Sequence, residues 1–208
     1  MFAKDRDLYV LELGLHKDVA WFGQRLLNAI GSLVGTTLTM NTGSLSSGGV
    51  AAGYVVIFDG VALEVVSVES DTQATVSLMR GDVGGSAIAG VSASSKSTVV
   101  YGYSPQVGIV HRQVLAMIGL DVDEDGFDES VVTNPGALVR LEALGALHLI
   151  YAAAGAPGRA GEKFDQRAKM YKERFASERE RVVAMIDLDG DGVAETKRRP
   201  NLFVLTRN

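Results

Sequence analysis

The hydrophobic pattern of the chain changes at Ser104-Pro105, and this change constrains the fold more than any other feature. Before it, residues 35–103 carry short apolar runs of period two, separated by Gly, Ser, Asn and Asp, which is typical of strands joined by turns. After it, apolar residues recur every three or four positions, as in helices. The chain is therefore predicted to be an α+β protein, with a small antiparallel β-barrel or sandwich inserted before a C-terminal antiparallel helical bundle.

Five short strands are predicted in residues 35–103, which form the predicted small β-domain. Asp59-Gly60 is the strongest hairpin signal in the chain, because this dipeptide suits the tight turns that join adjacent antiparallel strands. Closure of the sheet would hide the edges of such short strands, which favours a barrel or sandwich. The predicted strands lie at residues 36–40, 54–58, 61–68, 74–79 and 97–103.

Residues 1–34 are predicted to form a separate N-terminal segment, consisting of a helix and an extended arm. The apolar residues between Lys17 and Ile30 fit a helical stripe, so a short helix is expected there. Trp21 is the single tryptophan of the chain, and we expect it to anchor the core or to pack against a neighbour.

Residues 104–208 are predicted to form the helical domain with a C-terminal tail. Ser is a favoured N-cap and Pro suits the first helical position, so helices are expected over residues 105–118 and 135–153. The second of these is apolar almost all round and should be central. A long charged helix from Gly161 follows. One face carries an apolar stripe, and the opposite face of Glu, Lys and Arg is expected to contact water or another protein. Its apolar stripe comprises Phe164, Ala168, Tyr171, Phe175, Val182 and Ile186.

Composition argues against several functions. The formal net charge is −5 and neither half of the chain is basic, which disfavours a dedicated nucleic-acid binder. The chain has no cysteine and three scattered histidines, and it lacks a Walker or Rossmann glycine pattern. The most apolar window, residues 143–158, is too short to span a bilayer, so no membrane association is expected. We therefore predict that the protein is not an enzyme, and His111 and His148 are expected to be packed residues.

Two acidic loops share the pattern D-x-D-x-D-G-x-x-E, which suits a hard cation. Alternate side chains converge oxygens on one point, and Gly at the sixth place permits the turn. An EF-hand has Glu at the twelfth place, where these loops have Val132 and Arg198. Ca²⁺ as a structural ion and a metal-free acidic turn both remain open. The candidate ligands are Asp121, Asp123, Asp125 and Glu129 in the first loop and Asp187, Asp189, Asp191 and Glu195 in the second.

Three successive stretches of the C-terminal half carry a family resemblance: NPGALVRLEALGALHLIYAAAG, KFDQRAKMYKERFASERERV, and IDLDGDGV followed by a short basic tail. In order and texture they resemble head-to-tail connector (adaptor) proteins of long-tailed bacteriophages and prophages. The resemblance covers roughly residues 104–208. The β-rich part is similar to small β-modules of phage virion proteins, although the simplest adaptors lack such an insertion.

The resemblance implies a structural virion protein at the head–tail interface, made in the cytoplasm of the host bacterium. It implies a homo-oligomeric ring, usually twelvefold, between the portal protein and a tail-completion or neck protein. DNA would pass through the channel without specific binding, and no cofactor would be required. The residues expected to contact the portal or a neighbouring subunit are Arg198, Arg199, Leu202, Phe203, Val204 and Leu205.

Three alternatives stay open from the sequence. The chain could be another neck or tail-completion protein, or a calcium-stabilised binding module whose β-domain grips a ligand. The third is an enzyme that relies on carboxylates alone. Assembly state separates the ring subunit from the binding module, because a ring former and a monomer differ in mass.

Overall fold

The computed structural model describes residues 1–21, 24–120, 128–155 and 161–200. The chain divides into two compact units. One consists of residues 5–103, and the other combines residues 1–4 with residues 104–208. In sequence, the first unit is therefore inserted between residues 4 and 104 of the second, and it is called the barrel unit here. The other is called the helical unit.

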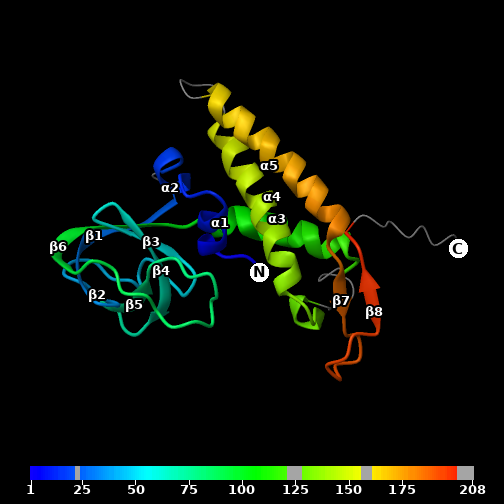
Figure 1. Cartoon of the computed structure of the whole chain (residues 1–208), viewed down its shortest axis with the longest axis horizontal. Helices are drawn as coiled ribbons and strands as arrows, with labels where there is room; N and C mark the ends of the chain where they lie inside the picture. Colours follow the sequence, from blue (N-terminus) through cyan, green and yellow to red (C-terminus); the bar gives the residue numbers. More distant parts are fainter. Residues whose placement is uncertain (22–23, 121–127, 156–160, 201–208) are drawn as a thin grey trace, which may run out of the picture. The chain divides into compact units, whose positions relative to one another are not determined.

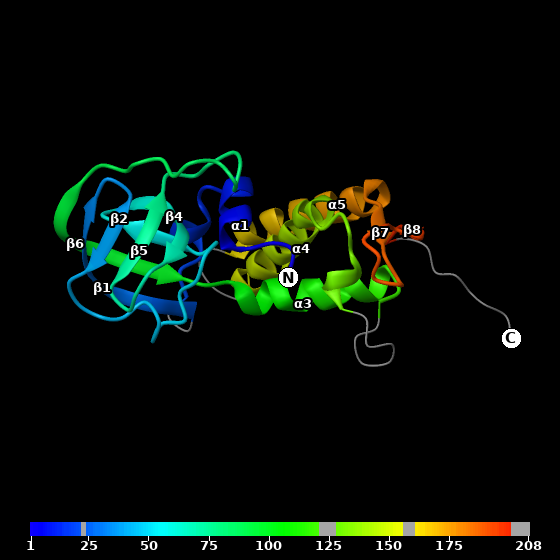
Figure 2. The same ribbon diagram turned by 90° about the horizontal axis from the view of Figure 1, so that it is seen from below.

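The barrel unit is a closed antiparallel barrel of six strands in the order β1-β2-β5-β4-β3-β6 (Figures 1 and 2). Closure leaves no long free strand edge, as the short-strand pattern predicted. In the described part of the chain before the first strand lie the short α-helices α1 (Asp5–Leu11) and α2 (Leu15–Asp18). The strands are β1 (Arg25–Val34), β2 (Thr37–Met40), β3 (Val55–Phe58), β4 (Val61–Val68), β5 (Gln73–Ser77) and β6 (Ala93–Tyr101).

The Asp59-Gly60 turn connects β3 to β4 as the sequence predicts. Phe58 pairs with Val61 across it, so the loop has two residues. Both loop residues have positive φ angles, 47° at Asp59 and 83° at Gly60. Two consecutive positive φ values define the type I′ geometry whose twist matches that of the adjoining strands. The α+β architecture with a small antiparallel barrel is thus confirmed.

The barrel is filled by the inward-facing residues of all six strands and by two residues of the loop between β2 and β3. Alternate residues of each strand point inward, which explains the period-two pattern of the sequence. The buried core comprises Leu33, Leu38, Met40, Leu45, Val50, Val56, Phe58, Leu63, Val65, Ala74, Val76 and Val100.

The helix predicted between Lys17 and Ile30 is wrong. Helix α2 ends at Asp18, so it overlaps the predicted helix by two residues, and Arg25–Val34 forms the longest strand of the barrel, β1. β1 pairs with both β2 and β6, so its backbone hydrogen bonds go to neighbouring strands rather than along the chain. These long-range pairings outweigh the local helical spacing of the apolar residues.

The helical unit contains three long helices and a two-stranded hairpin (Figure 1). Helices α4 and α5 lie side by side and run in opposite directions, which confirms the predicted antiparallel arrangement. The elements are α3 (Ser104–Met117), the short 3-10 turn η2 (Glu129–Val131), α4 (Gly136–Ala154), α5 (Gly161–Arg181), β7 (Ala184–Ile186) and β8 (Thr196–Arg198).

Helix α4 is the core helix of this unit. By length and composition alone it could cross a membrane, but residues around its whole circumference are buried within the protein. Gly145 lies at a close contact between α4 and its neighbours, since a Cβ there would lie 2.6 Å from Val110 of α3 and 3.0 Å from Phe175 of α5. Glycine therefore lets the three helices meet closely.

The predicted apolar stripe of α5 packs on α4 over most of its length. The rings of Tyr171 and Tyr151 stack 5.7 Å apart, and Phe164 contacts Tyr151 at 5.9 Å. The last two residues of the predicted stripe, Val182 and Ile186, lie beyond the end of the helix, however. The helix ends at Arg181, and Ile186 belongs to β7, which pairs with β8.

Candidate metal centre

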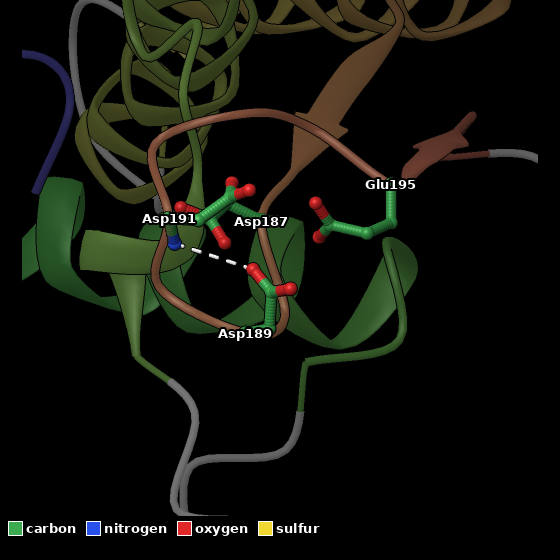
Figure 3. A group of neighbouring side chains, drawn as sticks. All are labelled: Asp187, Asp189, Asp191 and Glu195. Atoms are coloured by element: carbon green, nitrogen blue, oxygen red, sulfur yellow. Dashed lines mark hydrogen bonds between the residues drawn. The ribbon is translucent and has the colours of Figure 1, made fainter.

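The second acidic loop forms the tip of the β7–β8 hairpin (Figure 3). A helix that carried its apolar stripe as far as Ile186, as the sequence predicts, would lead directly into this loop. Strand β7 instead lies between α5 and the loop, so that expectation is wrong. The loop spans residues 187–195 and lies between Ile186 and Thr196, which pair across the hairpin.

Four carboxylates converge in this loop, those of Asp187, Asp189, Asp191 and Glu195. One oxygen from each lies within 4.8 Å of one oxygen from each of the others. Figure 3 shows Glu195 directed across the loop toward the three aspartates. All four predicted ligands of the second loop are thus brought together.

Asp187 organises the loop through its two oxygens. Oδ1 accepts a hydrogen bond from the backbone N–H of Gly190 at 2.6 Å, and Oδ2 accepts one from Gly192 at 2.7 Å. These N–H groups, first that of Gly192 and then that of Gly190, hold the pKa of Asp187 below its usual value. Both glycines have φ angles of 80° or more in the left-handed region, which explains their place in the motif.

The other acids complete the fold of the loop. Asp189 accepts a hydrogen bond from the N–H of Asp191 at 3.2 Å (Figure 3), and Asp191 accepts one from Val193 at 2.7 Å. Glu195 accepts one from Leu188 at 2.6 Å. A carboxylate oxygen has two acceptor sites, so one such bond leaves capacity for a cation.

The donor set fits a hard divalent cation. Ca²⁺ prefers carboxylate oxygens at about 2.3–2.6 Å, so two ligands on opposite sides of one ion lie roughly 5 Å apart. The 4.8 Å limit within the loop matches that separation. Three of the four acids are exposed and Asp187 is shielded, so a bound ion would remain accessible to solvent.

Arg198 occupies the place of the final EF-hand glutamate. Its guanidinium donates to the backbone oxygens of Ile118 at 2.9 Å and Gly119 at 2.6 Å. This contact ties β8 to the end of α3 within the helical unit. Of the other residues predicted at an interface, Arg199 is exposed, and Leu202, Phe203, Val204 and Leu205 lie outside the described residues.

The first acidic loop shows only its last predicted ligand. Asp121, Asp123 and Asp125 lie outside the described residues. Glu129 accepts hydrogen bonds from the amino group of Met1 and from His111 Nε2, both at 2.5 Å.

A buried polar cluster in the helical unit was missed from the sequence. His111 Nδ1 lies 2.9 Å from Glu142 Oε2, and the carboxylate of Glu142 also accepts from the backbone N–H groups of Phe2 and Ala3. Glu142 is fully buried in α4. A lone acid within an apolar helix requires buried donors, so its presence could have predicted such a cluster. The cluster fastens the first residues of the chain to α3 and α4.

A second missed cluster lies in the barrel unit. The buried carboxylate of Glu64 in β4 accepts from Arg6 Nε at 2.5 Å and from the guanidinium and backbone N–H of Arg80. Arg6 also donates to the backbone oxygen of Arg80 at 2.6 Å, and Arg80 donates to that of Gly85. The cluster joins α1, β4 and the loop after β5, and its satisfied charges serve structure.

A comparison with protein-family models, with curated proteins and with solved structures finds no match to this chain.

Proposed function

We propose that the chain is a structural subunit of a homo-oligomeric ring that joins the head of a long-tailed bacteriophage to its tail. One observation carries the proposal beyond the sequence resemblance. Helix α5 has 21 residues, and one face packs on α4 while the other exposes charged residues of both signs along its whole length. A face of this kind suits contact with another copy of the same chain.

The charges on α5 favour a protein partner over a polyanion. The exposed residues include Glu162, Lys169, Lys172, Glu173 and Glu180, so acids and bases are interspersed. A helix that bound nucleic acid would carry a basic stripe. Interspersed positive and negative charges instead allow ion pairs between neighbouring subunits, which fix the register and orientation of one subunit on the next.

In this assembly the ring, twelvefold in the proposal, would sit between the portal and a tail-completion or neck protein. DNA would pass through its channel without sequence-specific contact. The protein would require no catalytic residue, and it would act in the virion at the head–tail interface. Clusters such as Glu64 with Arg6 and Arg80 would then serve to hold the subunit rigid.

A pair of charge reversals tests the role of α5. Lys172→Glu on α5 and Lys17→Glu on the barrel unit make the same charge change at exposed positions. We expect Lys172→Glu to lower the particle mass measured by light scattering, or to make it more sensitive to salt, while Lys17→Glu leaves it unchanged. Equal effects of both substitutions, or no effect of either, would contradict the role given to α5.

A second proposal concerns the hairpin loop, which we infer binds Ca²⁺ as a structural ion. The observation that favours it is the convergence of four carboxylate oxygens within 4.8 Å. The ion would neutralise their mutual repulsion and stiffen the β7–β8 hairpin. A chain that melts at a lower temperature in chelator and remains monomeric would favour the calcium-stabilised binding module over the ring subunit.

A further inference from the structure

The barrel unit has an apolar pocket of about 250 Å³ in its wall. Its lining includes the buried residues Leu33, Phe58 and Leu63, which belong to the barrel core. Val61 and Val91 line it as well, with 47% and 86% of their surfaces exposed. The pocket thus leads from the core to an apolar opening on the surface.

The size and lining of the pocket favour an apolar side chain as the occupant. Pockets for small molecules and cofactors usually measure roughly 300–1,000 Å³ and place several polar groups around the ligand. Here Asp59 is the one charged residue in the lining, and it forms an ion pair with Lys96 at 3.0 Å. Exposed apolar surface around a depression is typical of a protein–protein contact.

The chain itself contains a segment with matching chemistry. Residues 202–205 read Leu-Phe-Val-Leu, and they lie within a stretch, residues 197–208, that has four Lys or Arg and no acid. The barrel unit has five Lys or Arg against nine Asp or Glu, a formal net charge of −4. An apolar segment flanked by positive charge therefore complements an apolar pocket on an acidic domain.

We propose that the pocket of the barrel unit receives the apolar segment Leu202–Leu205 of a second copy of this chain. The inference rests on the proposed ring and names a contact that would hold it together. The pocket and the apolar segment are different surfaces of the chain. Each copy would therefore insert its segment into one neighbour and receive the segment of another in its pocket. Such head-to-tail contacts close into rings when the rotation between subunits permits.

The absence of native cysteine allows a direct test in the full-length chain. One preparation carries Val91→Cys and the other carries Phe203→Cys, with a tag on one of them that makes the mixed dimer identifiable by size. The two are mixed and mildly oxidised. The control replaces Val91→Cys with Leu13→Cys, a residue of the same unit that is 67% exposed and does not line the pocket.

The expected result is roughly tenfold more mixed dimer with Val91→Cys than with Leu13→Cys, because cysteines whose Cα atoms lie beyond about 7 Å do not bridge. Equal yields would overturn the contact. A chain carrying both Val91→Cys and Phe203→Cys that links only within itself would also overturn it, since the tail would then occupy its own pocket.

Light scattering of the wild-type chain separates this inference from the proposed function. Multimers without selective cross-linking would refute the tail contact and leave the ring in place. A chain that stays monomeric and fails to cross-link selectively would refute both.

Discussion

The carboxylate of Asp5 accepts a hydrogen bond from the backbone N–H of Tyr103 at 3.1 Å, and this contact joins the first and last residues of the barrel unit. The hydroxyl of Tyr103 in turn donates to the backbone oxygen of Val19. The inserted unit is therefore closed at the point where the chain enters and leaves it. Oδ2 of Asp5 is buried without a hydrogen-bond partner among the described residues.

Asp5 should make stability depend on pH. Burial raises the pKa of Asp5 to about 7, against the lowering effect of the Tyr103 N–H. The folded chain then binds a proton more tightly than the unfolded chain, so the free energy of unfolding should fall as pH rises from about 4 to 7. Asp5→Asn removes the ionisable group, so this fall in the free energy of unfolding should disappear. The variant should then be more stable than wild type at pH 8, by up to about 4 kcal/mol.

Denaturant unfolding of wild type and Asp5→Asn between pH 4 and 8 measures this effect. Asp71→Asn, at an exposed position of the same unit, serves as control and should show no comparable trend. A difference between Asp5→Asn and wild type that is the same at every pH would contradict the assignment.

Removing the charge of Glu64 should strongly destabilise the barrel unit. Glu64→Gln leaves the buried guanidinium group of Arg80 without a counter-charge and leaves Arg6 with Asp7 alone, at 3.1 Å. Breaking a buried ion pair in this way costs about 3–5 kcal/mol. Asp59→Asn, which breaks the exposed pair with Lys96, should cost at most about 1 kcal/mol. Chemical denaturation of both variants gives the comparison, and similar losses would show that the buried cluster has no special role.

Two glycines of α4 should respond oppositely to alanine. Gly145→Ala places a methyl group 2.6 Å from Val110, and overpacking of this kind costs about 1–3 kcal/mol. Gly136→Ala meets open space and should stabilise the helix by up to about 1 kcal/mol. Thermal unfolding followed by circular dichroism distinguishes the two, and a stabilising Gly145→Ala would contradict the close packing of α3, α4 and α5.

Calcium should stabilise the chain through the hairpin loop. A ligand present at a hundred times its dissociation constant stabilises the folded state by about 2.7 kcal/mol. The double substitution Asp189→Asn and Asp191→Asn removes two ligand charges and should abolish the rise in melting temperature with Ca²⁺. The control, Glu162→Gln with Glu173→Gln on exposed positions of α5, removes the same charge and should retain the rise. No rise in wild type would refute the site.

The parts of the fold that follow from neighbouring residues could be predicted from the sequence. The Asp59-Gly60 turn and the start of α3 at Ser104-Pro105 depend on local backbone preferences, and the structure has both. Residues 25–34 form a strand because of pairing with β2 and β6, which their own spacing does not reveal. The end of α5 at Arg181 likewise depends on the pairing of β7 with β8.

The candidate sites divide in the same way. The carboxylates of the hairpin loop lie at alternate positions in one turn, so their convergence could be predicted from spacing alone. The contacts of Glu64 with Arg6 and of Glu142 with His111 join residues 58 and 31 positions apart. Only the fold brings these partners together, so the sequence indicated at most that a buried acid needs a donor.

The particle mass of the purified full-length chain tests the central proposal most directly. Light scattering across a range of concentrations, with negative-stain images of the same sample alone and with a phage portal protein, gives that mass and the particle shape. We expect ring-shaped oligomers, alone or on the portal, with a mass that is a fixed multiple of the 22.0 kDa chain. A chain that stays monomeric at every concentration and does not bind the portal would contradict the proposed function.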